Sequence, residues 1–385
     1  MKNKHLFNKM SAEKRKNPLK ECVKFIENHK LGYPKEDKPF ISSSEEEAFE
    51  IYEDKIFEIP KCNFVKSIGF VDGGNGPIIR SADFNVSLNR VSGVLFTTNK
   101  WTQLKKTPVK IEFYSVTVLD IFDDDTLGYI TRFFPLESEF REYLPKDDLK
   151  FSINDPTIRE RWFSLPNIEV FGGIAMRFAE WTYANKFILN ELDEGSIFVR
   201  DGSLQTGYTG ETILAEKLYN TAIKKGVVVS GLSKTCRLIT QNGNSLNSLI
   251  NYVGNKKFPS SAWYYHPIYR ITKAQEKADL YFVKLNKNSV YSFRFDILLD
   301  QAKEMSEDQC EIVISNIANN SNDLSYPGYP YGLIKADQLA AVSIKELEPQ
   351  KIQLIAEFDE EDYKKYILPR LRSVNAHDLL NIIRR

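Results

Sequence analysis

The chain has 385 residues, and its 52 lysine and arginine residues are balanced by 52 aspartate and glutamate residues. This length allows a substantial core in one elaborated domain, and the neutral balance means that a nucleic-acid partner would have to be bound by local basic patches. Apolar runs fall well short of the roughly 20 residues that a membrane span needs, which excludes a spanning helix. The four cysteines are Cys22, Cys62, Cys236 and Cys310. They are too far apart for a disulfide framework or a metal clip, and together with the lack of a signal peptide they predict a soluble, cytoplasmic protein.

Residues 1–60 are predicted to form an N-terminal helical extension that is first basic and then acidic. Lys14-Arg15-Lys16 lies at the centre of the lysine-rich part, and an acidic stretch runs from Ser44 to Asp54. Ser44 and Glu47 have the spacing of a capping box, so we expect a helix there. The basic arm could contact nucleic acid or a partner, but a solvated, partly frayed arm is the favoured interpretation.

Three strands are predicted next, because β-branched and aromatic residues alternate between turns rich in glycine, proline and asparagine. Consecutive strands of this type form a meander. The first strand ends at Asp72, which leads into a run of glycines, and the Asp123-Asp124-Asp125 run after the third is best explained as a charged turn. The three strands cover residues 66–72, 83–96 and 110–122.

Residues 135–193 change to helical periodicity, with the clearest helix at 173–192. Glu180 lies about 100° from the apolar stripe of this helix, on a flank that is neither plainly solvent nor plainly core. Taken alone, Glu180 would be a solvated residue, and its place between two strand-end aspartates makes it a candidate ligand. The stripe consists of Ile174, Phe178, Trp181, Ile188 and Leu192.

A βαβ pattern follows this helix. The apolar run that starts at Gly195 predicts a buried strand ending at Asp201, at the edge where open α/β sheets bind their ligands. Glu211 to Lys225 predicts a helix and Gly226 to Gly231 a second strand, and a right-handed crossover would make the two strands parallel. Lys234 lies just beyond this second strand, where a contact to phosphate and an ordinary surface lysine are equally supported interpretations. Residues 241–290 are polar and aromatic and predict an insertion that packs, or that stacks on bases.

Asp337 is the last acid that breaks its local pattern. Prolines in Tyr326-Pro327-Gly328-Tyr329-Pro330 end the preceding structure, and a helix is expected to follow. On that helix Asp337 has apolar residues three and four positions away on both sides, which predicts a buried carboxylate. Burial without a partner is costly, so a metal ion or a Lys or Arg salt bridge is expected there.

Four acids therefore form one candidate site: Asp72, Glu180, Asp201 and Asp337. Carboxylates hold hard divalent cations such as Mg²⁺ and Mn²⁺, which retain waters for chemistry. Only four histidines are present, with no H-E-x-x-H helix and no G-x-S-x-G elbow, which disfavours a zinc protease or serine hydrolase.

In their order along the chain, these motifs resemble the NurA nucleases. The resemblance is carried by strand-Asp-Gly-Gly at 72–74, the helical Glu180, strand-Asp-Gly-Ser-Leu at 201–204, Gly-Leu-Ser-Lys-Thr at 231–235 and Tyr-Pro-Gly-Tyr-Pro to Ala-Asp at 326–337. It implies an α/β, RNase H-like mixed sheet flanked by helices over residues 61–345, with insertions at about 135–170 and 241–290, and a C-terminal helical segment at 346–385. It also implies a homodimer that works with a HerA-type hexameric ATPase on single- and double-stranded DNA ends, in repair or in defence.

The resemblance further assigns roles within the site. Asp72 and Asp201 look like the central Mn²⁺ or Mg²⁺ ligands, Glu180 like the helical acid, and Asp337 like the last ligand, where many relatives have histidine. Tyr329 looks like the tyrosine near the active site, and Lys234 like a contact to the scissile phosphate. The implied reaction is phosphodiester hydrolysis by metal-activated water, with one ion or with two about 4 Å apart. The expected activities are 5′–3′ exonuclease and single-strand endonuclease.

Two other functions remain open from the residues alone. Phosphotransferases of the actin and sugar-kinase type also combine strand-end Asp-Gly turns with such a core, and the glycines at 73–76 could cradle phosphate. No second glycine cluster of that spacing follows Asp201, which disfavours this class. The chain could also be a non-catalytic scaffold for an ATPase, against which the four retained carboxylates argue.

Overall fold

The computed structural model describes residues 18–30, 32, 37–61, 67–98, 100–159 and 166–372. The basic arm at Lys14-Arg15-Lys16, Cys62 and the end of the C-terminal segment, 373–385, lie outside the described residues. The strands are β1 (Glu46–Ala48), β2 (Ile56–Glu58), β3 (Ile68–Arg80), β4 (Phe84–Thr97), β5 (Lys100–Thr102), β6 (Lys110–Ile121), β7 (Leu127–Pro135), β8 (Leu149–Ser152), β9 (Ile197–Asp201), β10 (Val228–Ser233), β11 (Trp263–Lys273), β12 (Glu276–Lys284) and β13 (Phe293–Leu298). The α-helices are α2 (Pro18–Lys30), α3 (Val170–Glu191), α4 (Glu211–Lys225), α5 (Leu246–Lys257), α6 (Leu299–Glu304), α7 (Glu307–Asn319), α8 (Tyr331–Ala340), α9 (Ile344–Ala356) and α10 (Glu360–Asp362). There are also short 3₁₀ helices, η1 (Glu53–Lys55) and η2 (Ser138–Tyr143), and a π-helix, η3 (Tyr363–Ile367).

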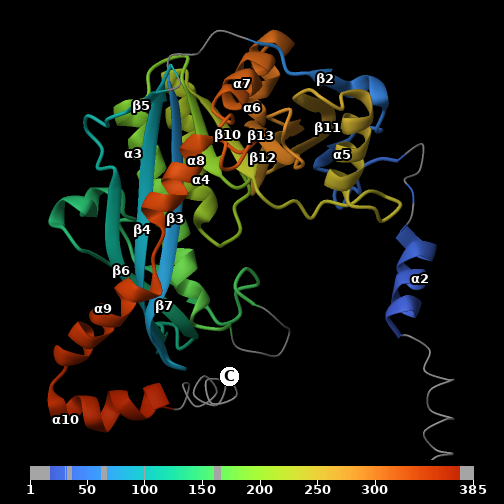
Figure 1. The fold of residues 1–385 in the computed structure, drawn as a ribbon. Helices are drawn as coiled ribbons and strands as arrows, with labels where there is room; N and C mark the ends of the chain where they lie inside the picture. Colours follow the sequence, from blue (N-terminus) through green and yellow to red (C-terminus); the bar gives the residue numbers. More distant parts are fainter. Residues whose placement is uncertain are drawn as a thin grey trace, which may run out of the picture.

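One mixed sheet organises the described part of the chain (Figure 1). Its strand order is β1-β11-β12-β13-β10-β9-β3-β4-β6-β7-β8, with β2 beside β11 and β5 beside β4. β9 runs parallel to both β3 and β10, and the other neighbours are antiparallel. This arrangement confirms the predicted α/β class with a mixed sheet flanked by helices.

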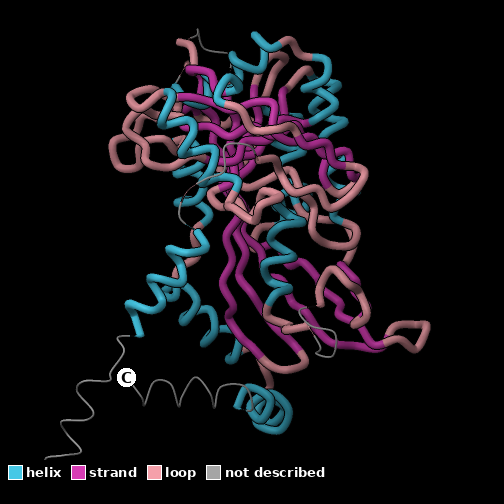
Figure 2. The backbone as a smooth tube through the Cα atoms, turned by 90° about the vertical axis from the view of Figure 1, so that its right-hand side faces the viewer, coloured by secondary structure: helices cyan, strands magenta, loops and turns pink. Residues whose placement is uncertain are grey.

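Helices cover both faces of the sheet at its centre. α3 and α4 pack on one face, where Val71 and Phe198 point into the larger core. α7 and α8 pack on the other face, against Phe70 and Val199. Alternation along β3 and β9 therefore places Asp72 and Asp201 on the α8 face and Arg200 on the α3 face. Figure 2 shows how the long strands extend beyond these helices toward the C-terminal helices.

Several predictions along the chain are confirmed. β3, β4 and β6 form the expected meander. The helix over Glu211–Lys225 has the predicted bounds, and the strand after it, Val228–Ser233, is parallel to β9. The acidic run near residue 124 is a turn, in which the Asp124 carboxylate accepts hydrogen bonds from Thr126.

The helix predicted from the Ser44 and Glu47 capping pattern is wrong. β1 occupies this stretch and pairs with β11, and the Glu46 side chain accepts hydrogen bonds from Lys273 and Tyr269. Because strand pairing satisfies the backbone and buries Glu46 beside its partners, tertiary contacts override the local helix signal. The stretch at 241–290, which was predicted to be an insertion, contains α5 and two strands, β11 and β12, that continue the sheet.

The predicted end of the first strand at Asp72 is also wrong, because β3 continues through the glycine run to Arg80. These glycines are needed for space, not for a turn. A Cβ at Gly74 would lie 2.2 Å from the carbonyl oxygen of Ala340, at the end of α8. Asp72 therefore lies in the middle of a long strand that is covered by a helix. Among the described helices, none is long and apolar enough to cross a lipid bilayer.

Candidate active site

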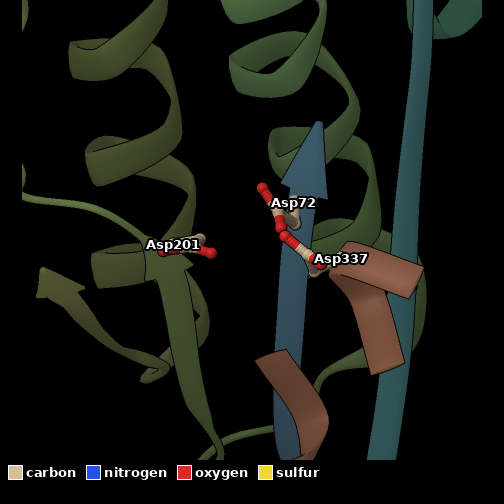
Figure 3. A group of neighbouring side chains, drawn as sticks. All are labelled: Asp72, Asp201 and Asp337. Carbon is tan, nitrogen blue, oxygen red and sulfur yellow. The ribbon is translucent and has the colours of Figure 1, made fainter. Parts of the chain in front are cut away.

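Three aspartates from three elements meet on the α8 face of the sheet (Figure 3). Asp201 ends β9, and Asp72 is its neighbour on β3, because the register pairs Val71 with Arg200 immediately before them. Asp337 comes from α8 and points toward Asp72. One carboxylate oxygen from each aspartate lies within 4.8 Å of the other two. The structure thus brings together three of the four predicted acids.

Asp337 reaches this group because α8 lies very close to the sheet. A Cβ at Gly332 would lie 2.1 Å from the Phe70 ring, so only glycine allows this approach. The Ser92 hydroxyl then donates to the carbonyl of Ala336 at 2.7 Å. The prediction of a buried Asp337 is wrong, since its side chain is 59% exposed. α8 packs through its neighbours Leu333, Ala336 and Ala340, which leaves Asp337 at the edge of the contact.

The cluster carries excess negative charge. Burial and the neighbouring carboxylates of Asp201 and Glu180 raise the pKa of Asp72 to about 9, against the opposing effects of Lys234 and the Gly73 amide. Asp72 is therefore held in its protonated form at neutral pH in the absence of a cation. A divalent ion would remove this repulsion, and three carboxylates are the donors that Mn²⁺ and Mg²⁺ prefer.

Lys234 and Tyr329 both contact the aspartates, as sequence analysis predicted they would lie in the site. Lys234 Nζ is 2.7 Å from Asp201 Oδ2 and 3.4 Å from Asp337 Oδ1. Burial opposes its charge, but the nearby carboxylates of Asp201, Asp72 and Asp337 together outweigh burial and raise the pKa of Lys234. The Tyr329 hydroxyl donates to Asp201 Oδ1 at 3.0 Å, and burial with the adjacent Asp201 charge raises the pKa of Tyr329 far above its usual range. Tyr329 is consequently a hydrogen-bond donor and not a base.

Glu180 lies on the other face of the sheet, and the structure does not place it among the three aspartates. Its side chain is buried on α3, where Oε1 is 2.8 Å from Nε of Arg200. The two atoms are not aligned for a hydrogen bond, so the contact is an ion pair. Burial raises the pKa of Glu180, while Arg200 and Arg177 oppose the rise. The expectation of a solvated Glu180 is wrong, and its role as a direct ligand stays a prediction.

Sequence analysis missed the groups that fix the segment after Asp201. Glu211 is fully buried at the start of α4 and accepts hydrogen bonds from the Gly207 amide and from Trp181 Nε1, each at 2.6 Å. It also forms an ion pair with Arg177. An acid in the first turn of a helix is ordinary, so the only sequence signal was a helix start soon after a candidate ligand.

Comparison with known proteins identifies the family. A sequence model described as the NurA domain matches residues 66–342, well over half of the chain. The chain belongs to the NurA family. Membership confirms the resemblance seen in the motifs and makes this NurA-domain protein a nuclease.

A comparison with solved structures found matches at low sequence identity. The NurA nuclease from Sulfolobus solfataricus is 13% identical with a TM-score of 0.47, covering 95% of this chain and 99% of that chain. Endonuclease V from Ciona intestinalis, in complex with inosine-containing DNA, is 12% identical with a TM-score of 0.34, covering 77% and 93%. Argonaute from Aquifex aeolicus is 9% identical with a TM-score of 0.28, covering 72% and 28%. No curated protein matches the chain.

Proposed function

We propose that this NurA-family nuclease is a deoxyribonuclease that requires Mn²⁺ or Mg²⁺ and hydrolyses phosphodiester bonds. The observation that carries the proposal is the convergence of Asp72, Asp201 and Asp337, whose carboxylate oxygens lie within 4.8 Å of one another. No histidine or cysteine is needed as a nucleophile in this scheme, because water is the attacking group.

The three aspartates would hold the metal ion. When bound, such an ion supplies an activated water and stabilises the charge that develops on the scissile phosphate. Its charge would also favour the ionised form of Asp72, whose pKa is raised by burial and by the carboxylates of Asp201 and Glu180. Glu180 could join as a ligand through the carboxylate oxygen that does not face Arg200, or by giving up its ion pair with Arg200.

The other side chains position and bind. Tyr329 holds the Asp201 carboxylate in place through its hydroxyl. Lys234, half-exposed at the cluster, already contacts Asp201 and Asp337 and is placed to turn its ammonium toward a non-bridging oxygen of the DNA backbone. Backbone contacts of this kind carry no sequence information, so we expect cleavage without sequence specificity.

The test is cleavage of end-labelled single- and double-stranded DNA in Mn²⁺, Mg²⁺ or EDTA. Wild type should cut only with metal, and Asp72→Asn, Asp201→Asn and Asp337→Asn should each lower the rate by at least roughly a hundredfold. The matched control is Asp120→Asn, which changes an exposed aspartate at the end of β6 and should cut DNA like wild type. Cleavage that persists in EDTA, or in folded Asp72→Asn and Asp201→Asn variants, would refute the metal site.

The family resemblance supports three finer proposals. The protein would be a homodimer, would act with a HerA-type hexameric ATPase in DNA end processing, and would combine 5′–3′ exonuclease with single-strand endonuclease activity. Light scattering of the purified protein tests the first, and cleavage with and without the ATPase and ATP tests the second. Oligonucleotides labelled at either end, together with circular single-stranded DNA, test the third, since a circle is cut only by an endonuclease.

A further inference from the structure

Two exposed tyrosines lie parallel to each other near the aspartates. Tyr291, between β12 and β13, is 55% exposed, and Tyr326, in the segment before α8, is 43% exposed. Their ring planes differ by only 6°, and the ring centroids are 6.1 Å apart. Large aromatic rings usually bury their faces in a core, so a parallel exposed pair leaves flat π surface available to a ligand.

A row of rings connects this pair to the aspartates. The edge of one ring in the Tyr326–Tyr329 pair meets the face of the other, with centroids 6.0 Å apart and planes at 86°. The Tyr329 hydroxyl in turn donates to Asp201. Lys234 lies 5.3 Å above the Tyr329 ring. A planar group that stacks on Tyr326 would therefore lie beside the position proposed for the scissile phosphate.

The two segments that carry the tyrosines are fastened before any ligand arrives. Ser289 Oγ donates to the carbonyl of Tyr291 at 2.9 Å and accepts from its amide at 3.1 Å. Asn286 donates to Asn322 of the other segment at 2.8 Å. Gly328 adopts φ +95°, and a Cβ there would lie 2.6 Å from Ser289, so the segments touch where only glycine fits. Pre-ordered rings lose little conformational entropy on binding.

We propose that Tyr291 and Tyr326 form a stacking platform for an unpaired base of single-stranded DNA, next to the bond to be cut. The inference rests on the proposed function and adds the substrate form that the site selects. A base inside a duplex is covered by its neighbours and offers no free face, whereas an unpaired base does. Every base has such a face, so the platform favours single strands or frayed ends without favouring a sequence.

The first test measures binding without catalysis. A single-stranded oligonucleotide carrying 2-aminopurine is titrated with protein in EDTA, because stacking quenches this fluorescent base. Relative to wild type, a Tyr291→Ala and Tyr326→Ala double variant should lose the quenching and bind roughly tenfold more weakly. The double Phe variant should retain both, since it keeps the rings. Tyr366→Ala, which removes a tyrosine of similar exposure (46%) on the C-terminal helices, should behave like wild type.

The second test separates the platform from the nuclease function itself. With Mn²⁺, the double Ala variant should have a KM for single-stranded DNA that is raised roughly tenfold while kcat stays within about twofold. If wild type cuts DNA and the double Ala variant shows unchanged quenching and KM, the platform is refuted and the nuclease function stands. An equal loss in the double Phe and double Ala variants would also refute stacking. If wild type neither cuts nor binds DNA, both proposals fail.

Discussion

Replacing Asp72 by Asn should make the metal-free protein more stable while abolishing its activity. Burial and the charges of Asp201 and Glu180 raise the pKa of Asp72 from an ordinary 3.8 to about 9. Between these two values the folded protein keeps a proton that the unfolded chain releases, so the free energy of unfolding falls as the pH rises. Asn has nearly the same shape and carries no charge to neutralise.

The size of the gain follows from the pH difference. Each unit of pKa is worth about 1.36 kcal/mol, and pH 7 lies about three units above the ordinary pKa, so the penalty at pH 7 is about 4 kcal/mol. We expect Asp72→Asn to recover about 2 to 4 kcal/mol at pH 7. The gain should vanish near pH 4, where the unfolded chain is also protonated, and should keep growing toward pH 9.

Urea unfolding in EDTA at pH 5, 7 and 8.5 measures this gain, with Asp120→Asn as a control that should match wild type at each pH. Adding Mn²⁺ should stabilise wild type by about 2.7 kcal/mol at a hundred times its Kd, and Asp72→Asn far less. A variant that is equally stable or less stable than wild type at pH 8.5 would refute the excess charge in the cluster.

The remaining predictions concern single side chains. Lys234→Gln should slow cleavage but bind Mn²⁺ about five- to tenfold more tightly, because the lysine ammonium no longer competes with the ion for Asp201. Calorimetry measures the Mn²⁺ affinity, and unchanged or weaker binding would contradict this competition. Glu211→Gln should cost about 2 to 3 kcal/mol in urea unfolding, because the fully buried carboxylate accepts hydrogen bonds from Gly207 and Trp181 and forms an ion pair with the partly exposed Arg177. A cost under about 1 kcal/mol would show that these contacts are dispensable. Burial alone would raise the pKa of Glu46, but hydrogen bonds, the largest of them from Lys273, lower this pKa to about 2. The ionised Glu46 therefore stabilises the fold above about pH 4.5, and this stabilisation is lost as the pH falls toward 2. Glu46→Gln should therefore be less stable than wild type at pH 6, with the difference shrinking by pH 3, and a difference independent of pH would exclude the ionic contribution.

Elements whose local pattern agrees with their tertiary surroundings could be predicted from sequence. Asp201 was placed correctly because an apolar strand of ordinary length ends there, and the helix at Glu211–Lys225 has a clear start and a C-terminal glycine. Asp72 was assigned to the site for a partly wrong reason. Its glycines were interpreted as a turn, whereas they make room for α8, and a helix that arrives from far along the chain leaves no local signal.

Burial of charged residues was the least predictable part of the site. Helical periodicity describes one buried face and left Glu180 on a flank between solvent and core, whereas the structure buries Glu180 because α3 is covered nearly all round. Its partner Arg200 comes from a different element, and no spacing in the sequence reveals that pairing. Asp337 shows the opposite error, because it was predicted to be buried and its side chain is exposed. Apolar neighbours at helical spacing do not reveal where the contact between a helix and a sheet ends. Tyr291 was not singled out because its relation to Tyr326 exists only in three dimensions.

The position of α8 near the end of the NurA domain also determines when the site can exist. Asp72 and Asp201 belong to neighbouring strands that can pair as soon as both have been synthesised. The third carboxylate arrives only when α8 settles onto β3 and β4, after almost the whole domain has left the ribosome. A chain that stops before Tyr331 lacks Asp337 and therefore cannot complete the three-aspartate cluster. If the three aspartates form the proposed metal site, the order of synthesis delays that site until the domain is nearly complete.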